Sequence, residues 1–517
     1  MKRILPWLAL FFFWAALYIP GLEDPEIKGE EARRALPAIT MLQTGDWVVP
    51  HLNGLPYLRK PPLVNWLIAA SVHASGKQDE WSVRLPSALA MLALGLAVFG
   101  TAARWLPRPM AWVAAAAALS GIGLWEKGRL AEIEAVYVAL TGIAFAWWLA
   151  AWVNRKRGFA LWLVPSLFLG LGLLAKGPAH VLFFYAIVIP VLFAAREQRE
   201  LWSAGHLVGL ALAGLVFAAW VVPYFHATAA IHANAIWANE MKQHVGGVHE
   251  SFASIGADVL NTLANGLPWI LLTPLWWSRR VLDGLEPRRR MLLSVARWPL
   301  ALGFVGIVLI PGMVPRYTLP FYPVLALLVA LVLPSVGPVA QKIWGGLNKT
   351  LAGLIAVGAV GSLFYVGGFA RVEWEDFRFA LVFATLAALA WRALKEERPV
   401  QLALGTTLAF AAVLAIYAAV IQPKVRQLAD LRGAGAKVAA TVPASSPLYL
   451  VDATCAPVLF YIPRPCTFLN SSEEMPKKAE YFLVLGKKLR GNLAQAHQLA
   501  HFGNSKDTQM LLLHLPR

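Results

Sequence analysis

Charged residues are scarce in this chain: Asp, Glu, Lys and Arg make up 15% of its 517 residues, whereas 58% are hydrophobic. Such a composition excludes an ordinary soluble domain. The long hydrophobic runs lack the alternation that a membrane β-barrel requires, so they are expected to form helices. No nucleic-acid-binding module is visible, and no nucleic acid is expected as a partner. The net charge of +17 instead suits contact with anionic membrane lipids.

Cysteine is also rare, and the only two, Cys455 and Cys466, lie in the C-terminal region of the chain. In an oxidising compartment they could close a small loop, and otherwise they remain free thiols; the sequence leaves both states open. A glycine-rich nucleotide fingerprint of the Rossmann type is missing, as is a cytosolic domain. The sequence therefore gives no indication that a nucleotide-linked substrate is used.

What the chain has in abundance is hydrophobic segments, most of them close to the ~20 residues that cross a ~30 Å hydrocarbon core as a helix. These segments predict a polytopic, all-α membrane protein with about thirteen transmembrane helices. The expected segments are 4–22, 85–103, 109–125, 133–153, 159–174, 178–195, 205–223, 257–277, 298–312, 319–336, 350–369, 376–393 and 400–421.

Strict alternation of these segments divides the linkers between two sides. Arginine-rich linkers, such as 154–158 and 278–290, fall on the side of Lys2 and Arg3, which the positive-inside rule makes the cytoplasm. The opposite side receives residues 23–84, 126–132, 175–177, 224–256, 313–318 and the tail. It also carries bases, which either contact lipid headgroups or bind a lipid phosphate: Arg33, Arg34, Lys60, Arg84, Lys127, Arg129, Lys176 and Arg316.

Both ends of the chain carry local signals. The first segment ends in Tyr-Ile-Pro-Gly-Leu-Glu-Asp, without a small-residue cleavage site, so it is expected to stay as a helix. The tail, residues 423–517, predicts a small outward-facing α/β domain beyond a membrane domain of residues 1–422. Its expected strands are 447–452, 481–485 and 509–514, and its expected helix is 493–500.

The first outward loop, residues 23–84, is too long and too patterned for a connector. It begins with adjacent carboxylates, Glu30 and Glu31, at the start of an amphipathic stretch. Turn signals follow at 45–46 and 53–54, and then Lys60 stands before two prolines. Aromatic residues between these signals are natural interface anchors, so the loop is expected to form juxtamembrane helices.

The ordered string in this loop resembles the membrane glycosyltransferases of the C-type (GT-C) fold. It consists of the acidic pair with Ala-Arg, then Gly-Asp-Trp-Val-Val-Pro, Leu-Asn-Gly-x-Pro-Tyr-x-x-Lys-Pro-Pro-Leu and Arg-Leu-Pro-Ser. The branch is that of the lipid A aminoarabinose transferases and the bacterial relatives of protein O-mannosyltransferases. The resemblance covers about residues 5–330, and the tail matches only in position and size.

The resemblance implies three catalytic candidates, all carboxylates. The family opens its first loop with an Asp-Glu pair, and this chain has Glu30-Glu31, which keeps the charge and lengthens the arm. The acid of the second outward loop matches Glu134, with Glu132 nearby. An acceptor hydroxyl needs a base within hydrogen-bond reach, and Glu30 is the first candidate. The alternative is that the pair belongs to an ordinary salt-bridged surface.

The resemblance also implies cations for the phosphate of a lipid-linked donor, because a lipid phosphate leaving group needs positive charge near the interface. Lys60 matches the family's lysine before proline, and Lys176 its third-loop lysine. The Pro-x-Tyr stretch matches Arg316 and Tyr317, whereas Met313 stands where the family often has a further lysine. That phosphate contact is either lost or supplied by Arg316.

Arg33, Tyr57 and Glu240 complete the implied site as residues of the substrate loops. The histidines of the large loop fit no zinc spacing. No cofactor is required, and a divalent ion held by the outward carboxylates stays open.

The sequence thus predicts a bacterial inner-membrane glycosyltransferase with its site facing the periplasm. It would move a sugar from an undecaprenyl phosphate to a glycolipid of the lipid A or lipopolysaccharide type, or to another envelope acceptor. A protein O-glycosyltransferase of the same fold is one alternative. A lipid or sugar transporter is another, although its charges would lie near mid-membrane and its halves would often repeat. A non-catalytic lipid-binding scaffold is the third.

Overall fold

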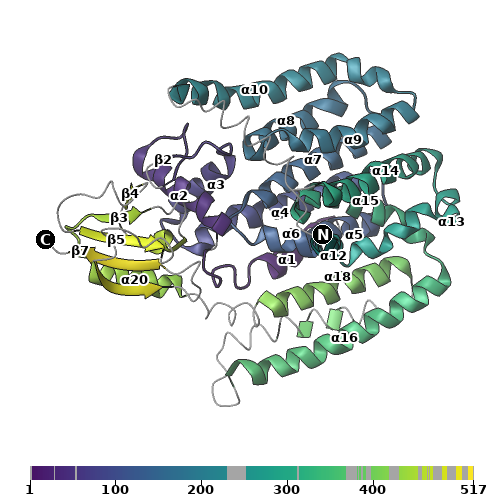
Figure 1. Ribbon diagram of the computed structural model, residues 1–517. Coiled ribbons are helices and arrows are strands. Elements are labelled where there is room, and N and C mark those ends of the chain that lie inside the picture. The colour runs from purple at the N-terminus through teal and green to yellow at the C-terminus, as the bar shows by residue number, and fades with distance from the viewer. Residues whose placement is uncertain are drawn as a thin grey trace. The chain divides into compact units, whose positions relative to one another are not determined.

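The computed structural model divides the chain into two compact units (Figure 1). The larger unit comprises Met1–Pro20, Arg59–Leu63 and Ser87–Val420, and the smaller comprises Gly21–Leu58, Val64–Pro86 and Ile421–Arg517. The structure describes residues 3–27, 29–52, 55–229, 252–310, 314–367, 381, 384–385, 388–389, 391, 398–418, 430–451, 457–462, 464, 466–469, 480–485, 496–502 and 510–515.

Among the described residues of the larger unit, every regular secondary-structure element is a helix. Helix α4 begins in the smaller unit and continues into the larger one. The described helices are α1 (Leu5–Tyr18), α4 (Glu80–Ala102), α5 (Arg108–Ser120), α6 (Ile122–Gly128), α7 (Ile133–Val153), α8 (Phe159–Lys176), α9 (Ala179–Ala194), η1 (Gln198–Trp202), α10 (Ala204–Ala227), α12 (Phe252–Asn265), η3 (Trp269–Trp277), α13 (Arg279–Asp283), α14 (Pro287–Leu309), η4 (Pro315–Phe321), α15 (Tyr322–Val332), η5 (Leu333–Ser335), α16 (Pro338–Gly367) and α18 (Pro399–Ile416).

Seven stretches among the described residues are long and apolar enough to cross a membrane as helices. They are Glu80–Ala102, Ile133–Val153, Phe159–Lys176, Ala204–Ala227, Pro287–Leu309, Pro315–Ser335 and Pro399–Ile416. Each overlaps one of the expected segments. The remaining segments stay predictions as membrane spans, and 376–393 lies mostly outside the described residues.

Two expected segments are wrong as single helices. The segment 109–125 divides where Gly121 takes an extended conformation between α5 and α6. The segment 257–277 divides at Pro268, which has no N–H to continue a helical ladder. Beyond that proline the chain follows the tighter η3 turns rather than an α-helix. In both cases the hydrophobic run was long enough, and a local backbone constraint interrupted it.

Helices α8 and α10 pack closely side by side (Figure 1). A Cβ placed on Gly205 would overlap the backbone of Gly158, and one on Gly170 would lie 2.9 Å from the Cα of Ala213. The contacting positions advance toward the C-terminal end of both helices together, from Gly158 with Gly205 to Gly170 with Ala213, so α8 and α10 run parallel. Small residues let the two backbones approach, as is common between membrane helices.

The smaller unit contains two stretches of chain that lie far apart in the sequence. The first outward loop forms α2 (Gly29–Thr44), the β1 (His51–Leu52) and β2 (Leu55–Pro56) hairpin and α3 (Leu63–Ser75). Gly45, with φ of 74°, follows the end of α2, as the turn signal predicts. The second expected turn, at 53–54, lies outside the described residues, although the strands on either side of it pair antiparallel.

The C-terminal region contributes a sheet with strand order β4-β3-β5-β7-β6. Its strands are β3 (Leu448–Val451), β4 (Thr467–Leu469), β5 (Glu480–Leu485), β6 (His497–Phe502) and β7 (Met510–Leu515), and its helices are α20 (Leu431–Thr441) and η7 (Pro457–Tyr461). Strands β3, β4 and β5 run parallel, whereas β7 is antiparallel to β5 and β6. Strands β3, β5 and β7 confirm the three expected strands.

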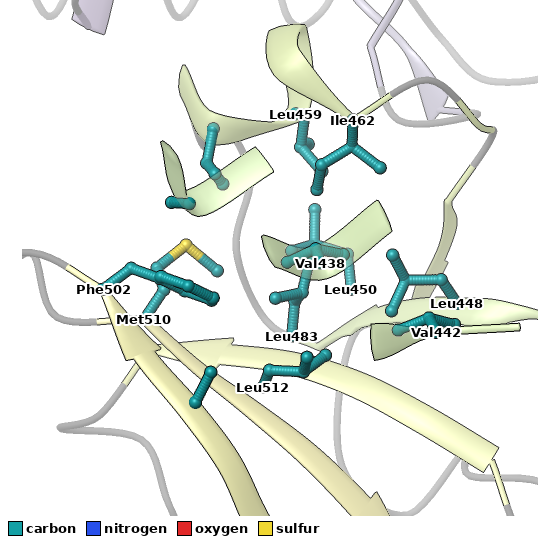
Figure 2. Packing of buried hydrophobic residues seen from close by; sticks show 13 residues of the cluster. Val438, Val442, Leu448, Leu450, Leu459, Ile462, Leu483, Phe502, Met510 and Leu512 are labelled. Atoms are coloured by element: carbon teal, nitrogen blue, oxygen red, sulfur yellow. The ribbon is translucent and has the colours of Figure 1, made fainter. Parts of the chain in front are cut away.

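A buried apolar core joins the sheet to α20 and η7 (Figure 2). Val438 of α20 and Leu459 of η7 meet Leu450, Leu483 and Leu512 from three neighbouring strands. The expected helix at 493–500 is wrong: residues from His497 on form β6. Ladder pairing with β7 overrides the local helical pattern there. The domain boundary at 422/423 stays a prediction, and the structure groups the first loop with the tail.

Candidate functional site

One charged cluster in the larger unit gathers residues from three predicted outward loops. Glu134 lies in the first turn of α7, Lys176 ends α8, and Arg316 lies in η4. The Nζ of Lys176 is 3.1 Å from Oε1 of Glu134, and the Nε of Arg316 is 3.6 Å from the same oxygen. The Glu134 side chain is only 9% exposed, so its charge is held by these partners rather than by water. The predicted catalytic acid and two predicted phosphate ligands thus lie together.

Aromatic rings surround the ammonium group of this cluster. The Nζ of Lys176 lies 4.8 Å from the ring centroid of Tyr317 and 5.2 Å from that of Tyr137. Both distances are within the range of cation–π attraction. Tyr317, expected to bind the donor phosphate, therefore contacts the lysine that shares this expected role. Tyr137 was not anticipated from the sequence.

The turn after Lys176 is held by a buried histidine. Gly177 has φ of 97°, a conformation open to glycine, and ends α8. The ring of His180 lies 2.9 Å from the carbonyl oxygen of Gly177 through Nδ1 and 2.8 Å from that of Leu169 through Nε2. These contacts connect α9 to the end of α8 and fix the direction in which Lys176 leaves the helix.

The other predicted acid of this loop is also paired. Glu132 lies just before α7, and its Oε2 is 2.9 Å from the Nζ of Lys127. Lys127 is also 3.5 Å from Glu126. The start of α7 therefore carries two neighbouring carboxylates with different cations, and Glu134 is the one bonded to the expected phosphate ligands.

A second group of predicted residues lies in the smaller unit, at the start of α2. Glu30 accepts a 2.6 Å hydrogen bond from Nη1 of Arg33 and lies 3.6 Å from Nη2 of Arg34. The guanidinium of Arg34 lies 5.3 Å from the ring centroid of Tyr57. The structure therefore brings together Glu30 and two expected substrate-loop residues, Arg33 and Tyr57. The Glu30 side chain is 35% exposed and remains accessible to a substrate.

Glu31 has a different environment from its neighbour. Its side chain is 1% exposed, and its two oxygens accept hydrogen bonds of 2.7 Å and 2.9 Å from Arg84. Arg84 is fully buried and also donates to the carbonyl oxygens of Leu22, Pro25 and Glu26. Such a fork-to-fork pair fixes backbone geometry. Glu31 is thus committed to a structural contact, although the sequence predicts a catalytic role for both glutamates.

Two bases expected at headgroups or phosphates are instead buried and bonded to carbonyl oxygens. Arg84 is one. The other is Arg129, which donates to the carbonyl oxygens of Leu17, Tyr18 and Pro20 at and beyond the end of α1. That expectation is wrong for both residues. Arg129 binds carbonyls that the end of a helix leaves unsatisfied, and Arg84 binds carbonyls of the segment that precedes α2. Sequence alone does not separate such arginines from ligand-binding ones.

The remaining predicted site residues are less defined. Lys60 belongs to the larger unit and is partly buried just before Pro61. Glu240 and Met313 lie outside the described residues. Within the described ranges, no group of three or more His, Cys, Asp or Glu side chains is arranged to hold a metal ion.

Cysteine pairing stays open, because Cys455 lies outside the described residues. Cys466 packs beside the core of the smaller unit, and burial raises the pKa of its thiol to about 12. This thiol is therefore protonated near neutral pH and a weak nucleophile.

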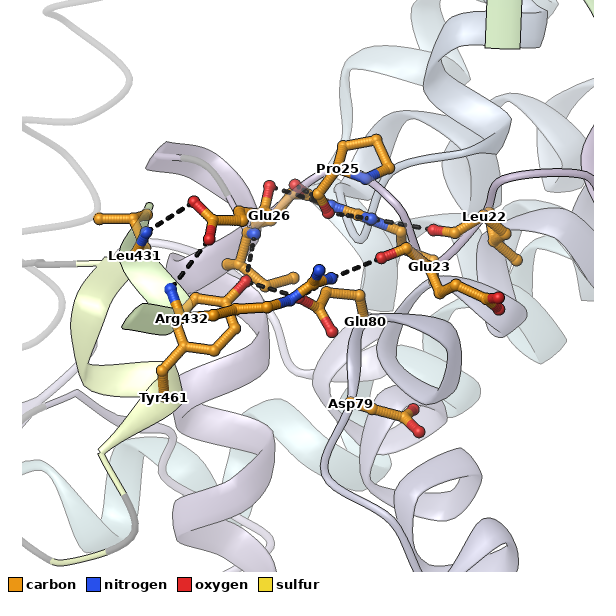
Figure 3. Close-up of polar contacts among 12 residues, drawn as sticks. Leu22, Glu23, Pro25, Glu26, Asp79, Glu80, Leu431, Arg432 and Tyr461 are labelled. Atoms are coloured by element: carbon orange, nitrogen blue, oxygen red, sulfur yellow. Dashed lines mark hydrogen bonds and ion pairs between the residues drawn. The ribbon is translucent and has the colours of Figure 1, made fainter. Parts of the chain in front are cut away.

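Sequence reasoning missed a polar network within the smaller unit (Figure 3). The guanidinium of Arg432 and the hydroxyl of Tyr461 both bond the carboxylate of Glu80, at 2.6 Å and 2.8 Å. Burial raises the pKa of Tyr461, so its hydroxyl keeps its proton and donates to that carboxylate. These partners are 352 and 381 residues away from Glu80, and no motif could have paired them.

Comparison with known proteins agrees with this architecture. Residues 59–224 match the family model described as dolichyl-phosphate-mannose-protein mannosyltransferase. An undecaprenyl phosphate-alpha-4-amino-4-deoxy-L-arabinose arabinosyl transferase of Edwardsiella ictaluri is 28% identical over 339 residues. That match covers 64% of this chain and 60% of the relative. The enzyme of the same name from Pseudomonas aeruginosa is 28% identical over 406 residues, which cover 76% of this chain and 71% of the relative.

Solved structures give the fold. The crystal structure of ArnT from Cupriavidus metallidurans bound to undecaprenyl phosphate superposes with a TM-score of 0.72 at 19% identity. The match covers 99% of this chain and 98% of that one. The apo structure of the same protein gives a TM-score of 0.73 at 18% identity.

The solved structures define the class by its fold, which is that of the C-type-fold membrane glycosyltransferases. Within that class the chain is similar to the aminoarabinose transferases. The resemblance inferred from the first outward loop is confirmed.

Proposed function

We propose that the protein transfers a sugar from an undecaprenyl phosphate to an envelope glycolipid at the periplasmic face of the bacterial inner membrane. The proposed donor sugar is 4-amino-4-deoxy-L-arabinose or a close analogue, and the proposed acceptor is of the lipid A type. The names of the relatives support this donor class. The observation that carries the proposal is the cluster of Lys176, Arg316 and Tyr317 on the carboxylate of Glu134.

In the proposed reaction, an acceptor oxygen attacks the anomeric carbon of the donor. The bond from that carbon to the phosphate oxygen breaks, and undecaprenyl phosphate leaves with the bonding electrons. Lys176 and Arg316 are proposed to bind the leaving phosphate, and Lys60 to contribute a further cation. Glu134 contacts both Lys176 and Arg316, which supports a role in positioning these cations rather than a role as the base.

Glu30 is proposed to accept the proton of an acceptor hydroxyl. It is the most exposed of the three predicted carboxylates, at 35% against 1% for Glu31 and 9% for Glu134. If the acceptor group is a phosphate, no hydroxyl proton has to be removed, and Glu30 orients the nucleophile. A single displacement of this kind inverts the anomeric centre.

The test is transfer in reconstituted liposomes. Purified protein is given a panel of undecaprenyl phosphate sugars with lipid A, other envelope lipids or peptide acceptors, and released undecaprenyl phosphate is measured. We expect transfer to a glycolipid, and about a tenfold or greater rise in the donor KM for Lys176→Gln and Lys60→Ala. Lys156→Gln, on an exposed linker, is the matched control. Protein that moves donor across the bilayer without transfer to any acceptor would instead favour a transporter.

A further inference from the structure

The C-terminal region of the chain carries no catalytic motif, yet it bonds directly to the segment that leads into the proposed base. We propose that Arg432, together with Glu26, makes this region a positioning element for the first turn of α2. The proposal rests on the function proposed above, in which Glu30 acts at that turn. All the residues concerned lie in the smaller unit.

The lead segment, residues 21–27, enters α2 with its carbonyl oxygens bonded by a side chain. Those of Leu22, Pro25 and Glu26 accept hydrogen bonds from Arg84, which also holds Glu31. One guanidinium therefore connects the lead segment with the first turn of α2. This fixes one side of the segment from within the first outward loop.

The other side of the segment is fixed by the C-terminal region (Figure 3). The carboxylate of Glu26 accepts hydrogen bonds from the backbone N–H groups of Leu431 and Arg432, at 2.8 Å and 2.9 Å. These N–H groups are at the start of α20, where a helix has unsatisfied donors and favours negative charge. Glu26 is buried, so the contact is shielded from water.

Arg432 also reaches back to the loop. Its Nη2 donates to the carbonyl oxygen of Glu23 at 2.6 Å, and its guanidinium pairs with the buried carboxylate of Glu80. The hydroxyl of Tyr461 accepts from the N–H of Ile27 at 2.8 Å. Glu23, Glu26 and Ile27 are thus bonded from outside the loop, immediately before the helix that carries Glu30.

An apolar contact also supports α2, at a position beyond Glu30. Leu36 of α2 packs against the core that α20 and η7 form with the sheet. The helix therefore rests on this core shortly after Glu30, while its lead segment is held before Glu30. Because misplacing a catalytic group by about 1 Å can reduce a rate by ~10²-fold, release of this support should affect turnover.

The experiment compares Arg432→Ala and Arg432→Lys in full-length protein, using liposome transfer and hydrogen exchange of residues 26–35. We expect Arg432→Ala to speed exchange there and to lower kcat by about 10- to 100-fold, with the donor KM nearly unchanged. Arg432→Lys keeps the charge beside Glu80 and should recover a fraction of kcat. Arg464→Ala is the matched control, because Arg464 donates to the carbonyl oxygens of residues 442, 443 and 446 within the C-terminal region itself.

A double variant separates positioning from general damage. If Arg432 acts through Glu30, Arg432→Ala should lower the residual rate of Glu30→Gln by less than about twofold. The inference would be overturned if Arg432→Ala lowered the rate of the Glu30→Gln variant as much as it lowers the wild-type rate. It would also be overturned if Arg464→Ala lowered kcat as much as Arg432→Ala does. In either case wild-type transfer, and with it the proposed function, would stand. Wild-type protein without transfer from any donor would overturn the proposed function and this positioning role together.

Discussion

At the scale of residues, the acidic pair of the first outward loop separates into two roles. Glu30 is accessible and contacts Arg33 and Arg34, whereas Glu31 is buried against Arg84. The two side chains are adjacent in sequence but point to different sides of α2. A helix turns about 100° per residue, which directs the side chains of adjacent residues to different sides of its axis. We therefore propose Glu30 as the reactive carboxylate, and Glu31 as a structural one.

This separation predicts that two matched substitutions change the stability of the protein by different amounts. Glu31→Gln leaves the buried guanidinium of Arg84 without its counter-charge and should destabilise the protein by about 3–5 kcal/mol. Glu30→Gln removes a partly exposed pair and should change stability by less than about 1 kcal/mol. Thermal unfolding of the purified protein in detergent measures both. Equal midpoints for the two variants would contradict the assignment.

At the scale of elements, two kinds of contact hold the helices of the larger unit together. One is close backbone packing between α8 and α10 at Gly158, Gly205 and Gly170. The other is a set of polar contacts around Glu197, here called the clasp, among the linkers on the predicted cytoplasmic side. There Glu197 accepts hydrogen bonds from Arg157, Arg288 and the indole of Trp152, at 2.6 Å, 3.0 Å and 2.7 Å. The first extends from Gly158, in a predicted cytoplasmic linker, to Gly170 in an expected membrane segment, and the second lies at the edge of the expected membrane region.

The packing contact predicts a difference between two glycines of α10. In Gly205→Ala the new methyl group would meet the backbone that leads into α8, which has no room to move, and we expect a loss of about 1–3 kcal/mol. In Gly214→Ala nothing lies within 4 Å of the new atom, and stability should be unchanged or higher. The midpoint of thermal unfolding in detergent measures the stability of both variants. A Gly205→Ala variant as stable as Gly214→Ala would refute the close approach.

The clasp predicts a dependence on pH. Hydrogen bonds from Arg157, together with those from Arg288, lower the pKa of Glu197 to about 2 despite partial burial. A depressed pKa stabilises the fold above the ordinary glutamate value near 4.5, and this contribution is lost as pH falls toward 2. The gap in unfolding midpoint between wild type and Glu197→Gln should therefore be full at pH 6 and narrow below about pH 4.5.

Glu286→Gln is the matched control for this pH series. Glu286 has a side chain that is 64% exposed and an ion pair with Arg289 at 3.4 Å. Its variant should follow the wild type at every pH. A gap for Glu197→Gln that stays constant down to about pH 3 would contradict the clasp's role.

At the scale of the whole molecule, we place the first outward loop and the C-terminal region on the periplasmic side. The structure groups these two stretches in one compact unit, which supports a shared side. The basic linkers would then face the cytoplasm, as the positive-inside rule predicts. The orientation itself stays a prediction.

Cysteine labelling tests this orientation. In a variant with both native cysteines changed to serine, Lys77→Cys should react with a membrane-impermeant thiol reagent in intact spheroplasts. Lys156→Cys should react only after the membrane is opened. Both positions are exposed, so access to solvent does not distinguish them. Labelling of Lys156→Cys in intact spheroplasts would reverse the proposed topology.

The sequence predicts much of the architecture because hydrophobic length and charge act locally. Helices such as α7 and α10 lie where their apolar runs predict them. The sequence does not predict the break at Pro268 or strand β6, because these depend on backbone geometry and on pairing with a distant strand.

The contacts of the candidate site are likewise predictable from the sequence only in part. Glu134, Lys176 and Arg316 were predicted from motifs, and the structure brings them together. The pairing of Arg84 with Glu31 and of Arg432 with Glu80 joins residues that no local pattern connects. Such pairs depend on tertiary packing, so a sequence pattern alone does not reveal them.

Glu30 is proposed to act as the base in a sugar transfer from a lipid phosphate. The most direct measurement is the single-turnover rate of transfer from undecaprenyl phosphate aminoarabinose to a glycolipid hydroxyl in liposomes, for wild type and Glu30→Gln. We predict transfer by the wild type and a rate about 10²- to 10⁴-fold lower in Glu30→Gln, at similar stability. Transfer at the wild-type rate by Glu30→Gln would contradict the claim.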